Sequence, residues 1–187
     1  HNRGFAWANK GDYDRAIADL NEAIRLNPTD ANAYTNRGFA WSEKGDRDRA
    51  IADFNEAIRL NPKYPNAYTN RGNAWGNKGD HDRAIADYNE AIRLQPNFFQ
   101  AYGNRGFAWQ NKGDFDRAIA DHNKAIQLNP RAYISYNNRG NAKAGLGKWE
   151  DAIADFQKAT EIAPNFAFAR ANYSLALYET GKIDTAV

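Results

Sequence analysis

Side chains able to do catalytic or metal chemistry are scarce in this sequence. Its histidines are His1, His81 and His122, and it has no cysteine. Disulfides, thiolate metal sites and cysteine nucleophiles are therefore excluded. No two histidines stand one helical turn apart beside an acid, as they do in a metal-binding helix. We expect the protein to hold neither a metal nor a cofactor.

Nucleophile and phosphate-binding motifs are missing as well. None of the serines, Ser42, Ser135 and Ser174, lies in a Gly-x-Ser-x-Gly elbow. The glycines are spread along the chain, and segments such as Asn77–Asp80 indicate turns between helices rather than phosphate-binding loops. The acids recur at a fixed interval, whereas an active site occurs once. We therefore expect no catalytic residue and no enzyme activity.

The sequence repeats itself at an interval of 34 residues. Three rows of identical residues keep this interval: Pro28, Pro62, Pro96, Pro130 and Pro164; Gly4, Gly38, Gly72, Gly106 and Gly140; and Ala16, Ala50, Ala84, Ala118, Ala152 and Ala186. Such a period is typical of stacked repeat proteins. The 187 residues hold about five and a half units and no methionine, so we expect a piece of a longer array.

Each unit has the pattern of two α-helices separated by a turn. In the unit 31–64, apolar and small residues recur every three or four positions, before Gly45 and again after Asp46. Gly45 can end the first helix, and Asp46 is a favourable N-cap for the second. Pro62 ends the second helix, because the residue before a proline avoids the α region. These hairpins predict an all-α fold.

Small and large side chains alternate in a way that predicts close packing within each hairpin. Gly38 and Ala50 would let two helices touch, and stacked neighbours would bury the apolar face that one hairpin leaves open. Two histidines fall in rows of large residues. His122 occupies the row of Leu20, Phe54, Tyr88 and Phe156, and His81 that of Tyr13, Phe115 and Trp149. We interpret both histidines as core side chains rather than ligands.

The unit resembles the tetratricopeptide repeat, a helical hairpin of about 34 residues. The residues that carry the resemblance in the second unit are Tyr34, Gly38, Trp41, Ala50, Phe54, Ala57 and Pro62. The resemblance covers essentially the whole chain and implies a right-handed superhelical α-solenoid. We expect one array over 1–187, with full units 31–64, 65–98, 99–132 and 133–166 and partial units 1–30 and 167–187.

One row departs from the family, which usually has a leucine before the glycine of the first helix. The row is Arg3, Arg37, Arg71, Arg105 and Arg139, and a row of acids keeps step with it: Asp19, Asp53, Asp87, Asp121 and Asp155. Because an unpaired buried charge is costly, we predict that each arginine pairs with an aspartate of its own or the preceding unit. Stacking of Arg37 on Trp41 would add a cation–π contact. The alternative is that the arginines extend into solvent.

Asparagines form a row on the first helices: Asn2, Asn36, Asn70, Asn104, Asn138 and Asn172. First helices line the concave face of such a stack, and a carboxamide both donates and accepts hydrogen bonds, which suits a peptide backbone. The row resembles the asparagine ladder in the tetratricopeptide superhelix of O-linked N-acetylglucosamine transferases. That resemblance implies binding of extended peptides through their backbone. The alternative is that these asparagines bridge neighbouring helices and contact no ligand.

A second row beside it varies between aromatic, amide and aliphatic residues: Phe5, Phe39, Asn73, Phe107, Asn141 and Leu175. Specificity can be encoded where a uniform repeat varies, and exposed aromatic side chains are typical interface anchors. The alternative is packing between adjacent first helices. Further groove candidates are Thr35, Thr69, Asn77, Gln100, Gln110, Asn111 and Asn137.

The sequence thus predicts a non-catalytic scaffold that binds a protein or peptide ligand, either an extended peptide or a partner helix, in a concave groove. The 25 Lys and Arg residues nearly balance 23 Asp and Glu, which argues against a nucleic-acid partner. No apolar run is long enough to insert into a membrane. The alternatives are a homo-oligomer formed through exposed repeat ends and the substrate-presenting arm of a larger enzyme. A basic clamp for a C-terminal carboxylate is disfavoured, since the lysine row lies near the turns: Lys10, Lys44, Lys78 and Lys112.

Overall fold

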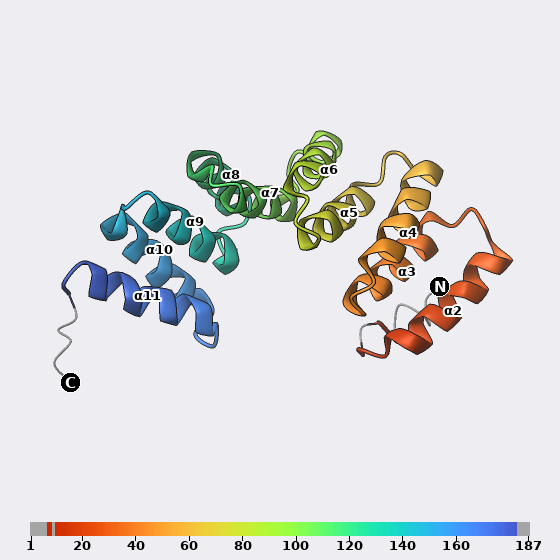
Figure 1. Cartoon of the computed structure of the whole chain (residues 1–187), viewed down its shortest axis with the longest axis horizontal. Helices are drawn as coiled ribbons and strands as arrows, with labels where there is room; N and C mark the ends of the chain where they lie inside the picture. The colour runs from red at the N-terminus through yellow and green to blue at the C-terminus, as the bar shows by residue number, and fades with distance from the viewer. Residues whose placement is uncertain (1–6, 9, 183–187) are drawn as a thin grey trace. The chain divides into compact units, whose positions relative to one another are not determined.

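The computed structural model describes residues 7, 8 and 10–182, which form α-helices and no β-strand. The helices are α2 (Tyr13–Leu26), α3 (Ala31–Glu43), α4 (Arg47–Leu60), α5 (Pro65–Asn77), α6 (His81–Leu94), α7 (Phe99–Asn111), α8 (Phe115–Leu128), α9 (Tyr133–Gly145), α10 (Trp149–Ile162) and α11 (Ala167–Glu179) (Figure 1). His1 and the row members Asn2, Arg3, Gly4, Phe5 and Ala186 lie outside the described residues.

The helices pack as the predicted hairpins within two compact units, residues 1–96 and residues 97–187. In the first unit α3 packs on α4 and α5 on α6, and successive hairpins meet where α2 contacts α3 and α4 contacts α5. In the second unit α7 packs on α8 and α9 on α10, while α8 contacts α9 and α10 contacts α11. First helices also touch one another, α3 with α5, α7 with α9, and α9 with α11. The fold is therefore the all-α arrangement of repeated hairpins that the sequence predicts.

Local side-chain chemistry fixes where the second helices begin. Asp46 is the N-cap of α4, and its Oδ1 accepts a hydrogen bond from the backbone N–H of Arg49 at 3.0 Å. The caps Asp12, Asp80 and Asp114 bond in the same way before α2, α6 and α8. Gly45 has a φ of 86°, a conformation that favours glycine, and so lets the chain reverse between α3 and α4.

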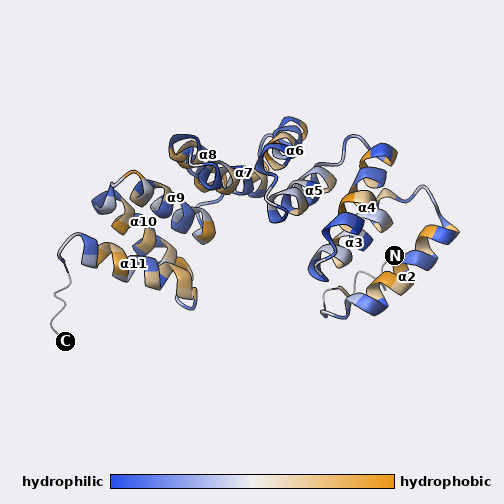
Figure 2. Cartoon of the chain, in the orientation of Figure 1, coloured by the Kyte–Doolittle hydropathy of each residue, from blue (hydrophilic) through white to orange (hydrophobic). Residues whose placement is uncertain are grey.

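A glycine of the first helix packs directly against a large side chain of the second. A Cβ atom added to Gly38 would lie 2.7 Å from Cε1 of Phe54, too close for any larger residue. Phe54, Ala50 and Ala57 are buried around this contact. Hydrophobic and hydrophilic residues are interspersed along the helices in Figure 2, as expected for helices that bury one face. The core is therefore a series of small hairpin interfaces.

His122 takes the place of the large side chain in the α7–α8 hairpin. As predicted, it is a core residue: its side chain is fully buried, and neither ring nitrogen has a hydrogen-bond partner among the described residues. Burial and, to a smaller extent, the positive charge of Arg139 lower the pKa of His122 to about 4, against an opposing effect of Asp155. His81 is only half-buried at the start of α6, so the prediction of a core side chain holds in part.

We predict that His122 makes the protein less stable as the pH falls from 6.5 toward about 4. The unfolded chain has the higher histidine pKa, so unfolding takes up a proton in this window and the free energy of unfolding decreases as the pH falls. The full loss is on the order of 3 kcal/mol. Denaturant unfolding at about pH 7.5 and about pH 4.5 measures it.

The matched variant is His122→Phe, which carries the residue found at Phe54 and Phe156. We expect this variant to retain more of its stability at the lower pH, because it has no proton to take up on unfolding. Equal losses of stability in both proteins would show that His122 is not the group responsible.

Candidate functional site

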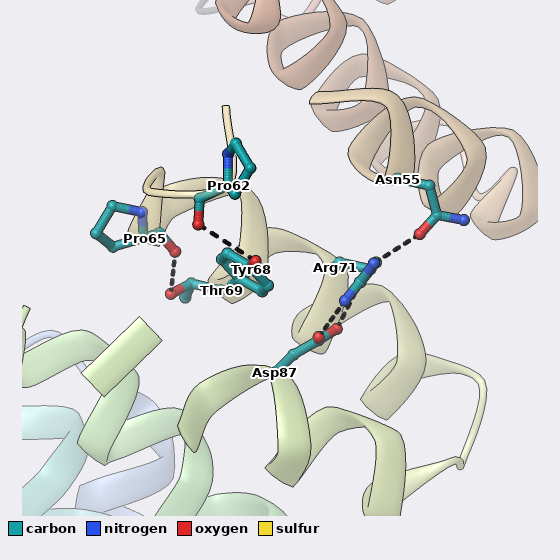
Figure 3. A network of polar contacts seen from close by, with 7 residues as sticks. All are labelled: Asn55, Pro62, Pro65, Tyr68, Thr69, Arg71 and Asp87. Atoms are coloured by element: carbon teal, nitrogen blue, oxygen red, sulfur yellow. Dashed lines mark hydrogen bonds and ion pairs between the residues drawn. The ribbon is translucent and has the colours of Figure 1, made fainter. Parts of the chain in front are cut away.

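Arg71 joins three helices. Its Nε donates to Asp87 Oδ2 at 2.9 Å and its Nη2 donates to Asp87 Oδ1, so both oxygens of the carboxylate on α6 are engaged (Figure 3). Its Nη1 donates to Asn55 Oδ1 on α4 at 2.7 Å (Figure 3). The arginine therefore connects α5 both to the second helix of its own hairpin and to the second helix of the preceding one.

The other described arginines of the row repeat this arrangement. Each binds the aspartate of its own hairpin through Nε and Nη2, in the pairs Arg37–Asp53, Arg105–Asp121 and Arg139–Asp155. Arg37 and Arg139 also donate to an asparagine of the preceding second helix, Asn21 and Asn123 respectively. Of the two pairings considered from the sequence, the structure has the one within a unit. The asparagines on the second helices were not anticipated.

These ion pairs are largely removed from solvent. The side chain of Arg37 is 21% exposed and that of Asp53 is 8% exposed. The hydrogen bonds to Asp53 raise the pKa of Arg37, and those to Asp87 raise the pKa of Arg71, although burial opposes both shifts. These arginines are therefore engaged in structural ion pairs and remain charged.

The predicted stacking of Arg37 on Trp41 is wrong. The guanidinium carbon of Arg37 lies 5.5 Å from the ring centroid of Tyr34, and that of Arg49 lies 3.7 Å from the ring centroid of Trp41. Asp53 holds the Arg37 guanidinium in place, which leaves the Trp41 ring to an arginine from the first turn of α4.

The Arg71–Asp87 pair can be tested by removing one or both partners. Arg71→Leu leaves Asp87 buried without its counter-charge, and we expect a loss of about 3 kcal/mol in the free energy of unfolding. Arg71→Leu/Asp87→Leu removes both charges and should recover most of that loss. Urea unfolding gives both values, and Arg93→Leu, which disrupts the exposed pair with Glu90, should change little. A double variant as unstable as the single one would contradict this account.

A cavity of about 530 Å³ lies between the first helices α7 and α9, within the second compact unit. Helix α7 contributes Phe99, Gln100, Gly103, Asn104 and Phe107 to its lining, and α9 contributes Tyr133, Ile134, Ser135 and Asn138. The loop between α8 and α9 contributes Asn129, Arg131 and Ala132. We call it the α7–α9 groove. It brings together four residues predicted to bind a ligand, namely Gln100, Asn104, Phe107 and Asn138.

The α7–α9 groove is mostly apolar and carries one formal charge. Phe107 is 49% exposed and Ile134 is 51% exposed, so both side chains present apolar area that a ligand could cover. Arg131 is exposed and is the one charged residue of the lining. No carboxylate lines the groove among the described residues. The surface therefore offers apolar area, amides and a single cation.

In the first compact unit, some of the predicted residues are also accessible. Asn36 and Asn70 are half-buried on α3 and α5, and neither makes a side-chain hydrogen bond within residues 7, 8 and 10–182. Phe39 is 40% exposed on α3. Asn77 and Asn111, in contrast, are exposed last residues of α5 and α7 and lie beside the turns.

Part of the asparagine row bridges helices, as the alternative interpretation supposed. Asn172 of α11 donates from Nδ2 to Asn137 Oδ1 of α9 at 3.0 Å, and Asn137 donates from Nδ2 to Asn138 Oδ1 at 3.1 Å. Asn137 is buried, so it is not a groove residue. Asn141 lines a smaller cavity of about 310 Å³ with Asn172 and Leu175.

Three predicted groove residues, Thr35, Thr69 and Asn73, have structural roles instead. Thr69 is 5% exposed, and its Oγ1 donates to the carbonyl oxygen of Pro65 at 3.1 Å, one turn earlier in α5 (Figure 3). Thr35 is buried in the same way. Asn73 accepts a hydrogen bond at its Oδ1 from the hydroxyl of Tyr88 at 2.8 Å. Because a buried hydroxyl needs a partner, Asn73 serves the hairpin core.

The α7–α9 groove also contains residues that sequence analysis missed. Gly103 stands where the equivalent units have Thr35 and Thr69, and Ser135 stands where they have Ala33 and Ala67. Phe99, Tyr133 and Ile134 likewise replace smaller or polar residues of the earlier units. Comparing the rows for positions that break the repeat would have identified them.

The described part of the chain offers no group of His, Cys, Asp or Glu side chains arranged to hold a metal ion. None of the helices within residues 7, 8 and 10–182 combines the length and apolarity of a membrane span.

Comparison with protein families identifies the repeat. The model described as tetratricopeptide repeat matches residues 65–98, 99–131 and 133–166, and a model described as TPR repeat matches residues 8–45 and 42–79. The chain belongs to the tetratricopeptide repeat family. Proteins of this family are generally non-catalytic scaffolds that bind protein or peptide partners.

Solved tetratricopeptide repeat structures share the fold. A crystal structure of MamA is 26% identical with a TM-score of 0.76, over 88% of this chain and 96% of that one. A thermophilic TPR protein of Thermus thermophilus is 22% identical with a TM-score of 0.78, over 95% and 96%. YrrB, described as a TPR protein with an unusual peptide-binding site, is 21% identical with a TM-score of 0.72, over 92% and 89%. A comparison with curated proteins gave no match.

Proposed function

We propose that this tetratricopeptide repeat protein is a non-catalytic scaffold that binds an extended polypeptide segment in the α7–α9 groove. The observation that carries the proposal is the meeting of Asn104, Phe107 and Asn138 in one apolar cavity between neighbouring first helices. The family membership and the likeness to YrrB, whose description names a peptide-binding site, support it.

Asn104 and Asn138 would hold the segment through its backbone. Equivalent carboxamides on successive first helices present donors and acceptors at a regular interval, and an extended backbone offers matching groups at regular intervals. Hydrogen bonds to the backbone do not depend on the ligand's side chains, so these amides bind many sequences. Asn36 and Asn70 offer the same chemistry in the first compact unit.

Binding in this mode is built from many small contributions. Each net hydrogen bond contributes about 1 kcal/mol, and ordering the extended segment costs free energy that offsets part of the sum. The expected affinity is therefore about micromolar for one segment. Such affinities allow partners to exchange, which suits a scaffold.

A direct test starts from twelve-residue peptides selected by display on the wild-type protein. We expect Asn104→Ala/Asn138→Ala to bind a selected peptide about tenfold more weakly, because two hydrogen-bonding side chains are lost. The thermal midpoint should fall only modestly, because both residues are half-buried, although Asn138 accepts a hydrogen bond from the buried Asn137. Isothermal titration calorimetry measures the affinity, and Asn165→Ala, at an exposed loop position, is the matched control.

A second peptide version isolates the backbone contacts. Methylating alternate backbone nitrogens of the selected peptide removes donors without changing its side chains. We expect this peptide to bind weakly to wild type and to be insensitive to Asn104→Ala/Asn138→Ala. Unchanged affinity of the unmethylated peptide for the double variant would remove these asparagines from the binding site.

A further inference from the structure

We propose that the α7–α9 groove selects its ligand through one anchor: a bulky apolar side chain of the bound segment, followed by an acidic residue that pairs with Arg131. The occupant is an internal segment of a partner polypeptide, with Phe or Leu as the anchor. This inference rests on the proposed function and adds sequence selectivity to backbone binding.

The first argument is that the groove is the place where the repeat changes. The position of Gly103 holds a buried threonine in α3 and in α5, Thr35 and Thr69. Gly103 lines the groove without a side chain, and a Cβ atom added to it would lie 3.2 Å from Oγ of Ser135, so a threonine at this position would take up groove volume and crowd Ser135. Features that every unit shares serve the scaffold, whereas a hollow formed by residues particular to two units can recognise one side chain.

The second argument is the apolar wall of the groove. Phe99, Phe107, Tyr133 and Ile134 line it, and two of them are about half exposed. Burying such area against a ligand side chain is favourable, and aromatic residues at the centre of an interface tend to dominate its binding energy. The volume of about 530 Å³ lies within the range of pockets that enclose small ligands.

The third argument is charge complementarity. Arg131 is exposed, and its backbone N–H donates a hydrogen bond to Asn129 Oδ1 at 3.0 Å. No carboxylate of the described chain forms an ion pair with it, and none lines the groove. This differs from Arg71 and its equivalents, which are held by aspartates. An acidic residue of the ligand, next to the anchor, supplies the missing counter-charge.

The test closes the hollow with residues that the chain already tolerates elsewhere. Gly103→Thr/Ser135→Ala gives α7 and α9 the threonine and alanine found at Thr69 and Ala67. Ser135→Ala alone is the matched control, because it leaves the space at Gly103 open. Circular dichroism and thermal unfolding establish that each variant is folded before binding is measured.

The probe is a twelve-residue peptide of Gly, Ser and Ala with a central Phe-Glu pair, acetylated and amidated so that its ends are uncharged. Its partners replace Phe with Ala or Glu with Gln. Titration into ¹⁵N-labelled protein gives the affinity and identifies the amides that shift. We expect the Phe peptide to shift Gly103 and Ser135 and to bind wild type at least about tenfold more tightly than the Ala peptide.

Three outcomes support the inference. Gly103→Thr/Ser135→Ala reduces the preference for Phe over Ala to below about twofold, whereas Ser135→Ala keeps it. Replacing Glu with Gln weakens binding about two- to threefold in wild type but not in Arg131→Gln. The Glu effect diminishes at high salt, as expected for an exposed ion pair.

Other outcomes overturn either the anchor or the proposed function, and the two failures are distinguishable. If closing the hollow leaves the preference for Phe unchanged while Asn104→Ala/Asn138→Ala weakens all peptides, the anchor is wrong and backbone binding stands. If the asparagine variant changes nothing but closing the hollow removes binding, the backbone proposal fails and the pocket stands. A free C-terminal carboxylate that binds better than the internal Phe-Glu pair contradicts the assigned ligand.

Discussion

The contact between a glycine of the first helix and a large side chain of the second is the constraint on which the structure depends. Gly38 and Phe54 are sixteen residues apart, and so are Arg37 and Asp53, each one position earlier. Once the glycine and the ring are in contact, the register of the two helices places the arginine beside the aspartate. The ion pair then joins the hairpin to its neighbour through Asn21. Close packing thus comes first, and the polar bridge follows from it.

Where a hairpin carries a residue that departs from its row, a nearby polar side chain can provide the new group with a partner. Tyr88 adds a hydroxyl to the core, and Asn73 accepts its hydrogen bond. Lys143 stands where the earlier hairpins have a tryptophan, and its Nζ lies 2.8 Å from Asp155 Oδ2. His122 is the exception, because its ring nitrogens have no partner among the described residues. In the α7–α9 groove, Gly103 of α7 and Ser135 of α9 both depart from their rows and lie close to each other.

Much of the fold could be predicted from the sequence, because 34-residue periodicity, N-cap aspartates and glycine rows are local signals. The Arg37–Asp53 pair could be anticipated for the same reason. The role of Thr69 could not, since whether a threonine faces a groove or bonds the preceding turn depends on neighbouring helices. The contact of Arg49 with Trp41 could not be predicted either, because it depends on how Asp53 orients Arg37. The groove lining was predicted only in part, because Phe99, Gly103 and Ile134 lie in rows other than the asparagine row and the variable row beside it.

A structural measurement tests the central claim most directly, namely that the first helices α7 and α9 hold an extended backbone. Nuclear Overhauser effects between the side-chain amide protons of Asn104 and Asn138 and the backbone protons of a bound peptide report that contact atom by atom. The account predicts such effects to both asparagines, together with contacts from one apolar peptide side chain to Phe107. Peptide contacts confined to the second helices α8 and α10, with none to Asn104 or Asn138, would contradict it.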